Sequence, residues 1–190
     1  MCWSANGSLA TWIAGMSIAL ASNRQYDPAL WNFMVLFTQI QLIEYFLWKD
    51  LRVPKLNAIW SKVGLTVILL EPLAAILLIK NANLRQKAIL AYGVWIAAVL
   101  LTQKFDFTTV VGGNGHLKWN WLIPSFWWAV PWFIFLFGAI WVSGNPRVFW
   151  FAVATWLISS YFYLRYKTIA SMWCWIAISM WLIYFIASRK

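Results

Sequence analysis

The chain has 190 residues, of which 63% are hydrophobic and only 11% are charged. Soluble domains are about 45–50% apolar and roughly 25% charged, so this composition excludes a water-soluble core and indicates that lipid surrounds much of the chain. The formal net charge of +10 comes from basic residues between apolar stretches, where they anchor helix ends and contact anionic lipid headgroups, so it does not indicate a nucleic-acid partner.

Seven apolar stretches approach the length of about 20 residues that a helix needs to cross a bilayer. In chain order they are 7–22, 29–48, 58–79, 88–103, 123–142, 147–166 and 169–188. The first follows no basic segment and precedes no clear cleavage site, so we expect a retained helix and not a signal peptide. The sequence therefore predicts an all-α integral membrane protein, a single bundle of seven transmembrane helices over residues 1–190.

Short connections join most of these spans. Pro28 is placed to open the second helix, and so few residues separate the last two spans that they must form an antiparallel hairpin. Seven spans place the termini on opposite sides of the membrane. Basic residues divide almost evenly between the two sides, so the charge distribution leaves the orientation open.

The second span carries a polar face. Thr38, Gln41, Glu44 and Trp48 share one side of a helix with 3.6 residues per turn, and we expect this side to look into the bundle. Glu44 lies about one turn from the end of its span, so reaching the interface or pairing with Lys49 are alternatives to a functional role.

The third span contains the pair Glu71-Pro72. An ionised side chain at bilayer depth costs at least about 2.5 kcal/mol, and a proline at 72 leaves the Ile68 carbonyl without its helical partner. We expect Glu71, Glu44 and the neutral Gln41 to bind a proton or a small ion. The alternative is that Glu71 hydrogen-bonds a neighbouring helix and only fixes packing.

The longest connection, 104–122, reads as an interfacial loop, with a partly re-entrant path as an alternative. It contains a glycine-rich run at 112–115 and the single histidine, His116. No strand is expected before the glycines and no Gly-Lys-Ser/Thr motif follows them, so they do not predict a phosphate site. His116 is either a hydrogen-bonded loop anchor or a ligand.

The two cysteines are candidate ligands of a metal ion or a haem. Cys2 and Cys174 could join His116 and a carboxylate around zinc, iron or copper, or around a haem. No spacing motif supports this set, and a buried cysteine commonly acts as a small hydrophobic residue. Cys2 is also close enough to the headgroups for acylation.

The fifth span has Pro124, Pro131 and Gly138 every seven residues on one face, which predicts a bend or a close neighbour. The tryptophans and phenylalanines between Trp119 and Trp141 are explained by packing and interfacial anchoring, or by a pocket for an apolar or lipid ligand.

Two classes of membrane protein are excluded. The last span, 169–188, has no lysine, so a covalently bound retinal on the usual pattern is not expected. One histidine cannot supply the zinc ligands of a multi-histidine membrane hydrolase.

Several short motifs carry a resemblance over almost the whole chain. They are the opening Met1-Cys2-Trp3-Ser4, Gln41-x-x-Glu44 before Trp48, Glu71-Pro72, His116-x-x-Trp119 and Trp173-Cys174. Together they resemble an uncharacterised family of small seven-span membrane proteins of large DNA viruses and some microbes. The resemblance implies no mechanism, but it groups Cys2, Ser4, Gln41, Glu44, His116 and Cys174 and implies a viral or host membrane.

Three functions follow as expectations. The first is a channel, transporter or sensor that binds or moves a small ion or molecule with Glu71, Glu44 and Gln41. The second is a membrane-embedded enzyme or cofactor protein with Cys2, His116 and Cys174 as metal or haem ligands. The third is a structural protein of a viral envelope. Lipid is the expected partner, and whether the chain forms a homo-oligomer is left open.

Overall fold

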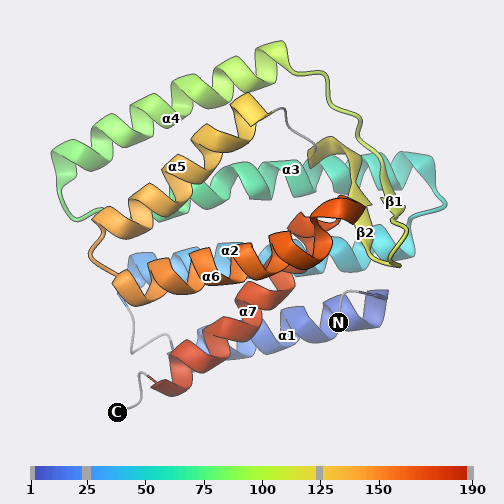
Figure 1. The fold of residues 1–190 in the computed structure, drawn as a ribbon, viewed down its shortest axis with the longest axis horizontal. Coiled ribbons are helices and arrows are strands. Elements are labelled where there is room, and N and C mark those ends of the chain that lie inside the picture. The colour runs from blue at the N-terminus through green and yellow to red at the C-terminus, as the bar shows by residue number, and fades with distance from the viewer. Residues whose placement is uncertain (1–2, 23–26, 123–125, 188–190) are drawn as a thin grey trace.

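In the computed structural model, which describes residues 3–22, 27–122 and 126–187, the chain folds into seven α-helices and one β-hairpin. The helices are α1 (Ala5–Ser22), α2 (Pro28–Lys49), α3 (Pro54–Ile76), α4 (Ala82–Thr102), α5 (Phe126–Val142), α6 (Pro146–Tyr163) and α7 (Ile169–Ala187). Most lie side by side along the long axis, and the hairpin lies at one end of the bundle (Figure 1). α2 packs against α1, α3 and α7 and supplies much of the buried core.

The seven helices follow the predicted apolar stretches in order, and their bounds differ from those stretches mainly at the ends. α2 begins at Pro28, as predicted, with the Asp27 side chain accepting a hydrogen bond of 2.8 Å from the Ala29 amide. α4 begins six residues before the predicted span because the Asn81 side chain caps it, accepting from the Leu84 amide at 3.0 Å. The charged residues between 82 and 87 are therefore helical and not part of a loop.

The connection 104–122, predicted as an interfacial loop, contains a short hairpin within an otherwise helical fold. β1 (Thr109–Val111) pairs antiparallel with β2 (Leu117–Trp119), and a 3₁₀ turn, Asn120–Leu122, follows. Asn57 of α3 donates to the Thr109 carbonyl and accepts from the Thr109 amide, both at 2.8 Å. Its side chain thus satisfies the backbone of β1 as a further strand would, and fixes the hairpin on α3.

Close helix contacts occur at glycines, though not where the fifth span predicted one. A Cβ at Gly15 of α1 would lie 2.7 Å from the Thr38 methyl of α2, and one at Gly64 would lie 2.8 Å from the Trp121 ring. No described atom comes within 4 Å of such a Cβ at Gly138. Pro131 does lie inside α5, whereas Pro124 falls outside the described residues.

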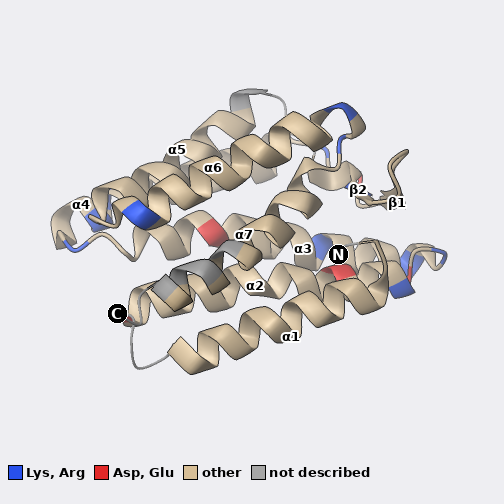
Figure 2. Cartoon of the chain, turned by 60° about the horizontal axis from the view of Figure 1, so that its bottom comes forward, with Lys and Arg blue, Asp and Glu red and all other residues tan. Residues whose placement is uncertain are grey.

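Within the described ranges, three helices, α2, α3 and α4, are long and apolar enough to cross a membrane. α4 buries only Tyr92 and Val99, and leaves Leu90 and Leu101 71% and 87% exposed. Lysine and arginine gather at the two ends of the bundle, and its middle is almost without them (Figure 2). An apolar outer surface between two cationic ends is the pattern of a chain that contacts lipid.

Candidate functional site

A cavity with a volume of about 360 Å³ lies between α3, α4, α5, α6 and α7. Its walls are mostly apolar and aromatic. The tryptophans among its lining residues are Trp95, Trp121, Trp128, Trp132, Trp156 and Trp173. Rings from four helices and from the 3₁₀ turn after the hairpin therefore surround one space.

One end of this cavity is cationic. Gln103 and Lys104 follow α4, Asn120 follows β2, and Lys167 lies between the 3₁₀ turn Leu164–Tyr166 and α7. These connections all lie at the end of the bundle that carries the hairpin (Figure 1). Both lysines are exposed, and no aspartate or glutamate is among the described lining residues. The cavity thus has a positive mouth and an apolar interior.

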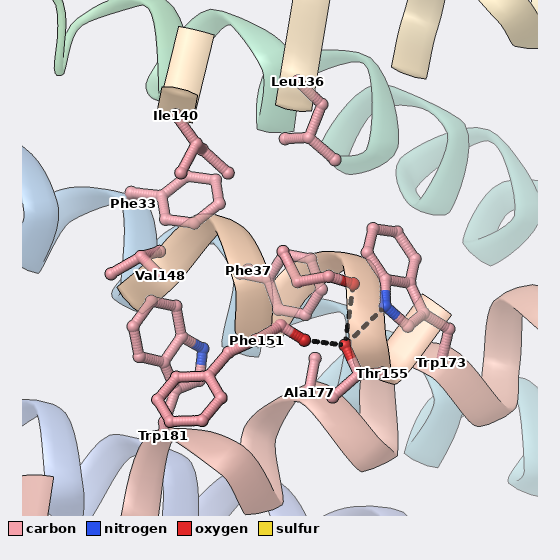
Figure 3. Close-up of a pocket in the computed structure, with 11 residues that line it drawn as sticks. Phe33, Phe37, Leu136, Ile140, Val148, Phe151, Thr155, Trp173, Ala177 and Trp181 are labelled. Carbon is pink, nitrogen blue, oxygen red and sulfur yellow. Dashed lines mark hydrogen bonds between the residues drawn. The ribbon is translucent and has the colours of Figure 1, made fainter. Parts of the chain in front are cut away.

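A second, smaller cavity of about 40 Å³ lies between α2, α5, α6 and α7 (Figure 3). Phe33, Phe37 and Trp181 are among its walls. Trp173 lines both cavities, and its indole N–H donates a hydrogen bond of 3.0 Å to the Thr155 hydroxyl. This space is too small for more than a few atoms, so the larger cavity is the candidate binding site.

The backbone that Pro72 releases is satisfied by neighbouring helices. The Ile68 carbonyl accepts a hydrogen bond of 3.0 Å from the Trp132 indole of α5. The Leu69 carbonyl accepts one of 2.6 Å from the Tyr92 hydroxyl of α4. These carbonyls tie α3 to α5 and α4, so the Ile68 oxygen is not left open for an ion.

Glu71 is completely buried in α3, beside Pro72. Neither of its carboxyl oxygens has a hydrogen-bond partner among the described residues. It is not among the described lining residues of either cavity. The side chain therefore lies in packed surroundings within the bundle.

Gln41 and Glu44 are completely buried in α2, which agrees with the inward face predicted for them. Glu44 does not reach the interface, and it is not without a partner. Ile43 contacts the position of Gly64, and Phe46 stacks on Trp60 with ring centroids 4.3 Å apart. These two contacts show which residues of α2 and α3 lie at the same height in the bundle. Measured along α3, Glu71 lies about eight residues, or about 12 Å, from the height of Glu44.

The candidate metal ligands do not form a cluster in the described part of the chain, where no three His, Cys, Asp or Glu side chains come together. The Nε2 atom of His116 accepts a hydrogen bond of 2.6 Å from the Trp3 indole, which joins Trp3 to the hairpin. Cys174 is buried and lines the large cavity. Cys2 lies outside the described residues.

No family model, curated protein or solved structure matches this chain. The resemblance to the proteins that begin Met-Cys-Trp-Ser therefore stays a prediction. The aromatic run from Trp119 to Trp141 does supply several walls of the cavity. Lys104 and Lys167 were not singled out by the sequence, because lysines at helix ends in a basic membrane chain resemble headgroup anchors.

Proposed function

We propose that this chain is a multi-pass integral membrane protein whose seven helices form one bundle, and that it binds a small, largely apolar molecule. The observation that carries the proposal is the aromatic cavity of about 360 Å³ between α3 and α7. Ligand sites in proteins typically have volumes of about 300–1,000 Å³ and walls that are predominantly apolar and aromatic. The exposed apolar surface of α4 supports the membrane setting.

The test fills the cavity without changing its charge. Ala170 lines the cavity, whereas Ala97 of α4 is exposed. In nanodiscs of neutral lipid, we expect decanol to bind the native protein in isothermal titration, after subtraction of empty nanodiscs. We expect Ala170→Phe to weaken this binding at least tenfold and the matched variant Ala97→Phe to leave it unchanged. Equal binding by two folded variants would place the ligand elsewhere, and absence of binding by the native protein would remove the proposal.

A second candidate, proton binding at Glu71, is favoured by the buried carboxyl group that lacks a partner among the described residues. A proton neutralises the carboxylate and removes the cost of a buried charge, and it needs no space in the packed surroundings of this side chain. In liposomes with an imposed pH gradient, we expect Glu71→Gln to abolish proton flux while the helix content is unchanged. Flux equal to that of the native protein would refute this candidate.

A further inference from the structure

We infer that the cavity binds a single-chain carboxylic acid, with the alkyl chain among the tryptophans and the carboxylate at Lys104 and Lys167. This rests on the proposed function, because it names the chemical class of the molecule that the cavity would bind. The two lysines lie at the mouth, and the described lining contains no acidic side chain that could neutralise them. An anion at this mouth is attracted and a cation is repelled.

The ammonium groups of Lys104 and Lys167 are exposed and available to a ligand. Neither ammonium has a hydrogen bond, ion pair or ring contact with another described residue. Other cations near this end do have ring partners: Lys62 lies 5.4 Å from the Phe107 centroid, and Arg165 lies 4.5 Å from that of Tyr166. A carboxylate between two lysines forms charge-assisted hydrogen bonds, which are about twice as strong as neutral ones.

The backbone at Lys167 is held in a conformation that lysine disfavours. Its φ of 57° places it in the left-handed region, where it is the one described residue other than glycine. Its amide donates to the Leu164 carbonyl at 3.0 Å, so the turn is tightly closed. Glycine would adopt this conformation without strain. A role for the charge of Lys167 would explain why a lysine, and not a glycine, occupies this strained backbone position.

The shape of the cavity suits one chain. Its lining includes Trp95, Val99 and Gln103, one turn apart along α4 and its C-terminal cap. At 1.5 Å per residue, the path from Gln103 at the mouth to Trp95 is about 12 Å long. The cavity volume is at the lower end of the range for small-molecule sites, about 300–1,000 Å³, which leaves no room for the two chains of a phospholipid. The cavity therefore holds one alkyl chain, and the inference names a free acid as its occupant; one chain of an anionic lipid is the alternative that the experiment separates from it.

The experiment compares three ligands with the same ten-carbon chain: decanoate, decanol and decyltrimethylammonium. Each is titrated into nanodiscs of phosphatidylcholine that contain the full chain, with empty nanodiscs subtracted. We expect decanoate to bind at least tenfold more tightly than decanol and the cation to bind most weakly. The double variant Lys104→Gln/Lys167→Gln should bind decanoate and decanol equally, and Lys118→Gln, which changes a lysine of β2 outside the cavity lining, should keep the preference.

Two further arms separate the inference from its alternatives. Lys167→Gly relieves the left-handed strain, so it should raise the unfolding temperature of the protein and lower its preference for decanoate over decanol. A preference equal to that of the native protein contradicts the role of Lys167.

Nanodiscs doped with phosphatidylglycerol should not reduce decanoate binding. Competition by this lipid would identify a headgroup as the occupant and overturn the inference. If decanol binds as tightly as decanoate, the inference fails and the proposed function stands; if neither binds, both fail.

Discussion

The hydrogen bond between Trp132 and the Ile68 carbonyl offers a sharp test of how the proline in α3 is accommodated. Pro72 has no amide hydrogen, so the carbonyl four residues before it must find another donor. The Trp132 indole supplies that donor at 3.0 Å. We therefore expect the free-energy cost of Trp132→Phe to depend on whether position 72 is proline.

The magnitude follows from the hydrogen bond and the lost ring. An average intramolecular hydrogen bond contributes about 0.5–1.5 kcal/mol, and interhelical side-chain bonds in a membrane protein average about 0.6 and reach about 1.7 kcal/mol. Trp132→Phe should thus lose about 1 kcal/mol through the bond, in addition to the packing lost with the smaller ring. In a Pro72→Ala background the restored backbone amide at position 72 can donate to the Ile68 carbonyl, so only the packing loss should remain.

The assay is a double-mutant cycle of Pro72→Ala and Trp132→Phe, with unfolding free energies from denaturation in mixed micelles. We expect a coupling energy of about 1 kcal/mol, the size of the lost bond. The packing loss cancels because it is common to both backgrounds. A coupling energy near zero, with both variants folded, would refute the idea that Trp132 replaces the missing amide.

The remaining predictions concern the hairpin and the helix glycines. Gly64→Ala would bring a Cβ within 2.8 Å of the Trp121 ring, and we expect it to lower the unfolding free energy by about 1–3 kcal/mol. The control Gly93→Ala, where no described atom lies within 4 Å, should be neutral or stabilising by up to about 1 kcal/mol; equal losses in the same denaturation assay would contradict the contact. Asn57→Ala removes both 2.8 Å bonds to the Thr109 backbone, so amide hydrogen exchange at β1 should accelerate while α4 keeps its protection. Unchanged exchange in β1 would show that Asn57 does not hold the hairpin.

The order and approximate ends of the helices could be read from the sequence, because long apolar stretches and the residues that open and cap helices are local signals. Pro28 opening α2 is an example. The hairpin could not be read in the same way. Its strands are only three residues long and depend on Asn57, which lies about fifty positions earlier in the chain. A contact of that separation leaves no trace in local periodicity.

For the candidate site too, some features could be predicted from the sequence and others depend on how the helices pack. That Glu71 and Pro72 stand out within an apolar stretch follows from the sequence, since charge and a missing amide are properties of single residues. Only the tertiary structure decided what surrounds them. Trp132 and Tyr92 donate hydrogen bonds to the preceding carbonyls of α3. Ile68 and Leu69, which carry those carbonyls, line the cavity that has Lys104 and Lys167 at its mouth. The physical reason is that a cavity is made by side chains from several helices, and helix packing brings together residues that no spacing in the sequence connects.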